Sequence, residues 1–100
     1  MSGKVIVVNP NGQVSEHPWH GPLDEDGMPA GPFGLKFLQD LLGGWLEGCV
    51  VEWEGVRRWG YIDEEGKMKG LADNMVATKA MVSLMPGDHI AGPLLIWIPP

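Results

Sequence analysis

The segment "FGLKFLQDLLGGWLEGCVVEWEGVRRWGYIDEEG", residues 33 to 66, changes from helical to strand periodicity at a pair of glycines. Over residues 33 to 43 the apolar side chains recur at every third or fourth position, which predicts one amphipathic helix. Gly43 and Gly44 predict the end of that helix, because glycine readily adopts the left-handed conformation common at helix C-termini. The segment therefore indicates a helix that leads directly into strands.

Two β-rich runs, "WLEGCVVEWEG" and "RRWGYIDEEG", follow the glycines and meet at Gly55 and Val56. Together they predict an antiparallel hairpin. Because Leu46, Val50 and Trp53 do not keep a strict alternation of apolar and polar positions, we expect Gly48 to mark a β-bulge.

The flanking segments predict the remaining strands. "KVIVVNP" indicates a buried strand that ends in a turn, and "QVSEHPW" a short edge strand, since Pro18 has no backbone donor. "HIAGPLLIWIPP" is apolar on both faces, which indicates a central strand or an interface, with a bulge near Pro93. Residues 20 to 32 hold three prolines, three glycines and three acids and predict a long loop. Residues 74 to 84 are either irregular or a second short helix.

These elements predict a single α+β domain over residues 1 to 100. It consists of a mostly antiparallel sheet of about five strands, with the helix of residues 33 to 43 packed on one face. A chain of 100 residues with 44% apolar content builds only a modest core. With five tryptophans to accommodate, part of the apolar surface is available for self-association.

Composition and charge narrow the classes of function. The formal net charge of -6 argues against nucleic-acid binding, because phosphates are repelled unless cations gather on one face, and only Arg57 and Arg58 are adjacent. No apolar run approaches the length of about 20 residues that spans a bilayer. A single cysteine, Cys49, lies in an apolar run where a buried, unreactive thiol is usual. We therefore expect a cytoplasmic protein.

No motif indicates an enzyme, a cofactor or a metal. Residues 63 to 66, "DEEG", are typical of a tight turn in which Gly66 takes a positive φ. The following "GKMKG" lacks the spacing of a phosphate-binding loop. His17 and His20 could hold zinc with a third ligand from Asp24, Asp26 or His89, but loop histidines without cysteine partners are more often solvated. Cys49 and His89 could form a thiol pair, yet the expected burial of Cys49 disfavours it.

The aromatic residues suggest a binding surface. Trp53 and Trp59 flank the hairpin turn beside Arg57 and Arg58, a combination enriched at protein interfaces. A solvated hairpin with stacked side chains explains the same residues equally well. For Trp45 and Trp97 we favour burial in the core.

The order "LQDLLGGWLEG", "GYIDEEGKMKGLADNMVAT" and "GDHIAGPLLIW" resembles a family of small domains of unknown function found in bacteriophages and bacterial mobile elements. The resemblance extends from Val5 to Ile98, with an inserted loop at residues 20 to 32. The family pattern has Asn, Ile and Pro where this chain has Asp63, Leu46 and Ala72. The resemblance implies a phage setting in a bacterial host cytoplasm and a similar fold, but no reaction.

Three residues match positions of the family motifs: Glu47, Lys69 and Asn74. If they converge beside Trp45, they would suit a small polar or nucleotide-like ligand. The alternative, which we rank slightly higher, is that Asn74 caps the following segment and Lys69 pairs with Glu47.

Two functions therefore stay open at this point. The first is a non-enzymatic phage accessory protein that binds a host protein or itself. The second is a small-molecule binder that sequesters a nucleotide-like signal.

Overall fold

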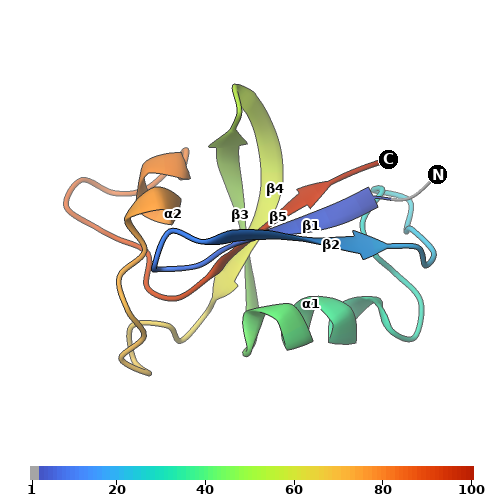
Figure 1. Cartoon of the computed structure of the whole chain (residues 1–100), viewed down its shortest axis with the longest axis horizontal. Helices are drawn as coiled ribbons and strands as arrows, with labels where there is room; N and C mark the ends of the chain where they lie inside the picture. The colour runs from blue at the N-terminus through green and yellow to red at the C-terminus, as the bar shows by residue number, and fades with distance from the viewer. Residues whose placement is uncertain (1–2) are drawn as a thin grey trace.

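The computed structural model describes residues 3 to 100 as one five-stranded antiparallel sheet in the order β2-β1-β5-β4-β3, with two short helices (Figure 1). The elements are β1 (Gly3–Val8), β2 (Val14–Trp19), α1 (Gly34–Leu42), β3 (Leu46–Trp53), β4 (Val56–Asp63), α2 (Met75–Ala80) and β5 (Leu94–Ile98). The α+β prediction is confirmed. The strand with Pro18, β2, lies at an edge, and the last strand, β5, lies at the centre, both as predicted.

The helix α1 covers one face of the sheet, as its amphipathic pattern predicts. Leu38 and Leu42 point into the core and pack with alternate residues of β1 and β5. Gly43 ends the helix with φ 84°, and its amide donates to the carbonyl of Gln39 at 2.7 Å. In Figure 1 the helix lies below β1 and β2 and leads back to the start of β3.

The second helix, α2, covers the opposite face. Ala77 is fully buried among Ile6, Val8 and Leu94, which point away from α1. Because both faces of β1 and β5 are covered, Val5 to Val8 of β1 and Leu94 to Ile98 of β5 are all apolar, which is why the last strand shows no alternation. The helix spans Met75–Ala80 and is shorter than the predicted range of residues 74 to 84.

The β3–β4 hairpin pairs residue for residue from Leu46 opposite Asp63 to Trp53 opposite Val56. The predicted bulge at Gly48 is therefore wrong. The irregular apolar pattern has another cause, since Leu46 and Trp53 point to opposite faces of the sheet and both faces are partly covered. The turn consists of Glu54 and Gly55, with φ 51° and 79°, one residue earlier than predicted.

The bulge predicted near Pro93 is also wrong. Pro93 lies directly before β5, where its missing N–H removes no bond of the sheet. The registers of β5 with β1 and with β4 then run without interruption from Leu94.

Residues 20 to 32 form the predicted loop, with one isolated bridge between Leu23 and Pro29. Two indoles hold this loop in place. The Nε1 of Trp19 donates to the carbonyl of Pro22 at 3.0 Å, and the Nε1 of Trp97 donates to the carbonyl of Gly27 at 2.8 Å. Burial of Trp97 is confirmed at 3% exposure, whereas Trp45 is 65% exposed, so its predicted place in the core is wrong.

Neither helix in residues 3 to 100 has the length and apolar character needed to cross a bilayer.

Candidate functional site

The turn after β4 is organised by a buried carboxylate. The Oδ2 of Asp63 accepts from the Nζ of Lys69 at 2.8 Å, and its Oδ1 accepts from the amide of Glu65 at 2.8 Å. Burial raises the pKa of Asp63, but the hydrogen bonds from Lys69 and the Glu65 amide outweigh it and hold the pKa below its ordinary value. Lys69 therefore pairs with Asp63, and the pairing with Glu47 considered from the sequence is wrong.

Close packing in and beside this turn explains the glycines at positions 44 and 66. A Cβ at Gly44 would lie 2.5 Å from the Oδ2 of Asp63 and 2.6 Å from the Nζ of Lys69. Gly66 does not take the predicted positive φ. A Cβ there would collide with the carbonyl oxygen of Ala91, so Gly66 lets two chain segments touch.

Asn74 is a structural residue. Its side chain is fully buried, and its Nδ2 donates to the carbonyls of Val8 and Gly92, both at 2.9 Å. Its Oδ1 accepts from the amide of Ala77 at 3.0 Å, which makes it the N-cap of α2. Capping, the alternative that we ranked higher, is confirmed. Both amide hydrogens are used, so the side chain has none to offer a ligand.

The four residues predicted to surround a ligand thus do not converge. Trp45 is exposed, Lys69 is held by Asp63, and Asn74 is buried. Glu47 alone among them lines a groove.

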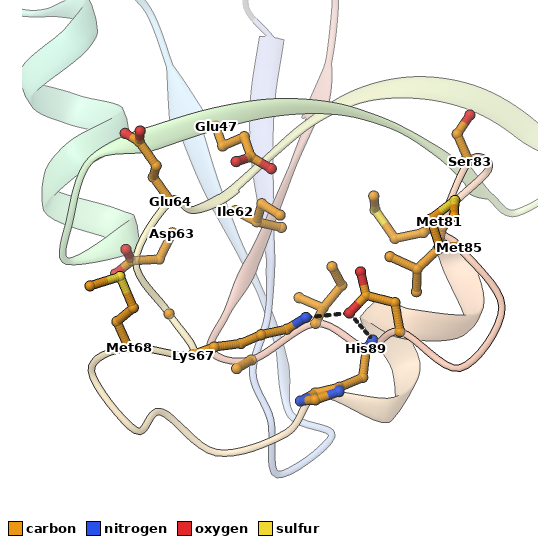
Figure 2. A pocket seen from close by; sticks show the side chains of 15 residues that line it. Glu47, Ile62, Asp63, Glu64, Lys67, Met68, Met81, Ser83, Met85 and His89 are labelled. Atoms are coloured by element: carbon orange, nitrogen blue, oxygen red, sulfur yellow. Dashed lines mark hydrogen bonds and ion pairs between the residues drawn. The ribbon is translucent and has the colours of Figure 1, made fainter.

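This groove has a volume of about 440 Å³ and lies between the β3–β4 hairpin and the chain that follows α2 (Figure 2). Figure 2 shows Glu47 and Ile62 extending from the strands, with Met68 on one side and Met81 and Met85 on the other. We call it the methionine groove. Its lining residues are Glu47, Ile62, Asp63, Glu64, Gly66, Lys67, Met68, Met81, Ser83, Leu84, Met85, Asp88, His89, Ile90 and Ala91.

The methionine groove carries an excess of negative charge. Lys67 pairs with Asp88, and its hydrogen bond holds the pKa of Asp88 below the ordinary value. Glu47 and Glu64 have no cationic partner within residues 3 to 100. An unpaired carboxylate attracts cations and repels phosphates. The groove therefore favours a cationic ligand over a nucleotide.

Three groove residues, Met68, Met81 and Met85, were missed from the sequence. Met68 and Met85 are exposed by 87% and 73%, which is unusual for apolar side chains. Met68 and Met85 lie in irregular segments, and local sequence patterns do not show that these segments meet.

The hairpin residues predicted to form one surface are divided between two faces. Trp59 and Arg57 alternate with Tyr61 and so lie on the α1 side, where Tyr61 contacts the core. Trp53 and Arg58 lie on the opposite side, where Trp53 packs against the α2 core.

Exposure separates the two pairs further. Trp59 is 57% exposed, whereas Trp53 and Arg58 are half-buried. The Nε1 of Trp53 and the Nε of Arg58 are buried without a hydrogen-bond partner. On the α1 side, a cleft of about 130 Å³ separates Trp59 and Arg57 from the 20 to 32 loop.

The residues considered for catalysis do not assemble. Burial, and then the charge of Glu47, raise the pKa of Cys49 to about 11, so the thiol is protonated at neutral pH. The Nε2 of His89 contacts Asp73 at 3.1 Å instead, and His17 contacts the hydroxyl of Ser15 at 2.9 Å. Residues 3 to 100 contain no cluster of three histidine, cysteine or acidic side chains that could hold a metal ion.

Comparisons of the chain with protein-family models, with curated proteins and with solved structures gave no match.

Proposed function

We propose that this protein acts by non-enzymatic binding of another protein, in the phage-like setting that the sequence resemblance implies. The observation that carries the proposal is the exposed Trp59 beside Arg57 on the outer half of the β3–β4 hairpin. Figure 1 shows this half of the hairpin extending away from α1, so α1 leaves the Trp59 face uncovered, while α2 packs on the opposite face. Tryptophan and arginine are the residue types most enriched among those that dominate binding energy at interfaces.

The surroundings of Trp59 support the proposal, because they are held in a fixed arrangement. The cleft beside Trp59 is lined by Gly27, Met28 and Trp97, and the indole of Trp97 donates to the carbonyl of Gly27 at 2.8 Å. A surface that is already ordered loses little conformational entropy when a partner binds. We call Arg57, Trp59 and the adjacent cleft the hairpin surface.

The nucleotide-binding alternative finds less support. It depended on Lys69 and Asn74 meeting a ligand beside Trp45, and both residues have other partners. Catalysis finds no support either, since the pKa of Cys49, about 11, keeps the thiol protonated.

The chain offers a matched control for a test of the hairpin surface. Trp45 is as exposed as Trp59 (65% against 57%) but lies outside the hairpin, in the turn after α1. Tagged wild-type protein and the variants Trp59→Ala and Trp45→Ala are used to capture partners from a bacterial host lysate. Light scattering of the purified proteins measures self-association, and near-ultraviolet circular dichroism checks that each variant folds.

We expect Trp59→Ala to lose the captured partner, or the self-association, and Trp45→Ala to keep it. Arg57→Ala should weaken the same interaction. If Trp59→Ala binds as well as the wild type, the hairpin surface is not the binding site.

A further inference from the structure

A second binding surface is formed where an edge of the sheet meets the methionine groove. β3 is the outermost strand, and only part of its free side is covered. The amide of Val82 donates to the carbonyl of Val50 at 3.2 Å, and Met81 forms a bridge with Val51. The chain then leaves the strand, so the earlier part of β3 has no neighbour on this side within residues 3 to 100.

Gly48 is the centre of this open edge. In an antiparallel strand every second residue directs its N–H and C=O to the same side. Because Val50 directs its carbonyl to Val82 on the outer side, Gly48, two residues earlier, directs its own backbone groups outward too. A Cβ built at Gly48 would meet nothing within 4 Å, so a second backbone has room to approach.

The methionine groove lies directly beside this edge. Glu47 lines it from β3. Met81, Ser83, Leu84 and Met85 line it from the segment that covers the next part of the edge. Side chains of a strand alternate between faces, so every second side chain of a peptide paired with Gly48 would enter the groove. Figure 2 shows Glu47 and Ile62 directed into this space from the hairpin.

The groove chemistry defines the side chains it would accept. Ile62, Leu84 and Ile90 offer apolar contact, and the methionine thioethers adapt to apolar groups of different shapes. Glu47 and Glu64 are exposed carboxylates without an ion pair in residues 3 to 100, and they complement a lysine or arginine.

We propose that the open edge of β3 at Gly48 binds an extended, basic and apolar segment of a partner protein, whose alternate side chains enter the methionine groove. Main-chain pairing with an exposed sheet edge is an established mode of peptide recognition. This proposal uses residues other than the hairpin surface and does not depend on it.

A second copy of the chain is a poorer occupant. Pairing two β3 edges would bring two acidic grooves together, and each copy carries a net charge of -6. Like charges at close range oppose such an association.

The probe is a set of fluorescent seven-residue peptides in which threonine alternates with leucine, isoleucine or methionine and one lysine or arginine. A matched set has glutamate in place of the cation. Binding to the full chain is measured by fluorescence anisotropy, and amide shifts by NMR. Glu47→Lys reverses the charge at position 47 in the groove, while Glu52→Lys makes the same change on the other face of β3.

We expect members of the basic set to bind, to shift the Gly48 amide, and to lose at least tenfold in affinity with Glu47→Lys but less than twofold with Glu52→Lys. Trp59→Ala should leave this binding unchanged. The inference is overturned if no basic peptide binds, if acidic peptides bind equally, or if Glu47→Lys has no effect. A wild-type dimer with a protected Gly48 amide would also overturn it, in favour of a second copy.

Discussion

Removing the side chain of Asn74 tests whether one buried amide joins three parts of the fold. Asn74→Ala deletes hydrogen bonds to Val8 at the end of β1, to Gly92 before β5 and to Ala77 in α2. Each bond contributes about 0.5–1.5 kcal/mol, and a buried group left without a partner costs about 1–3 kcal/mol. Three such groups give a loss of at least about 3 kcal/mol, compared with a total stability of about 5–15 kcal/mol for a domain.

Urea unfolding, followed by tryptophan fluorescence, measures this loss. The same change should lower the thermal midpoint by about 12 °C or more, at roughly 4 °C or more for each kcal/mol. Asn11→Ala is the matched control, because Asn11 is exposed and accepts a single hydrogen bond, from the amide of Gln13. It should cost less than about 1 kcal/mol.

Asn74→Asp separates the cap from the other two bonds. Asparagine and aspartate are equally good N-caps, so a residue that only caps α2 would tolerate this change. Here the new oxygen would face the carbonyls of Val8 and Gly92. We expect Asn74→Asp to be at least as destabilising as Asn74→Ala at pH 7.

The stability of the Asn74→Asp variant, measured as a function of pH, tests the same role further. Burial next to carbonyls raises the folded pKa of the new carboxyl above its unfolded value. The loss of unfolding free energy caused by the substitution therefore grows as the pH rises from about 4. The deficit relative to wild type should be smaller at pH 3, where the protonated carboxyl donates one hydrogen bond. An Asn74→Asp protein as stable as wild type at pH 7 would refute the three-way role.

Three further predictions concern the thiol and the buried ion pair. Cys49, with a pKa of about 11, should react with iodoacetamide at pH 7.5 far more slowly than the thiol of an unfolded sample in urea. The Asp63–Lys69 pair stabilises the fold above the unfolded aspartate pKa of about 3.9, and its contribution is lost as the pH falls through the lowered folded value. In urea titrations the stability difference between wild type and Lys69→Met should therefore be larger at pH 7 than at pH 2. Gly44→Ala should reduce stability, because the added methyl group displaces the same ion pair. If the Gly44→Ala variant unfolds at the same urea concentration as wild type, the packing argument is wrong.

Local patterns were sufficient for most of the secondary structure. The helix of residues 33 to 43 was predictable from the spacing of its apolar residues. Its end was predictable from Gly43, because glycine readily adopts the positive φ observed there. The division of the hairpin residues between two faces was also predictable, since Trp53 and Trp59 lie on opposite sides by strand alternation and the two-residue turn. Bulges were predicted where alternation failed, but burial of both sheet faces explains that failure.

The methionine groove was not predictable from local patterns, because its walls meet only through long-range contacts. Met68 follows β4, while Met81 and Met85 follow α2, and their proximity depends on where α2 is anchored. Asn74 and Thr78 provide that anchor. Thr78 donates to the carbonyl of Asn74 at 2.7 Å and accepts from the amide of Ile90 at 2.9 Å.

In the proposed peptide complex, this anchor gives Asn74 an indirect part in binding. Asn74 is fully buried and does not itself line the methionine groove. Yet it fixes α2 to β1 and to the segment before β5, and the methionines of the far wall continue from α2. A folded Asn74 variant should therefore bind basic peptides more weakly, whereas Glu47→Lys should weaken binding without loss of stability. Comparing the two variants at temperatures well below their unfolding transitions distinguishes positioning from contact.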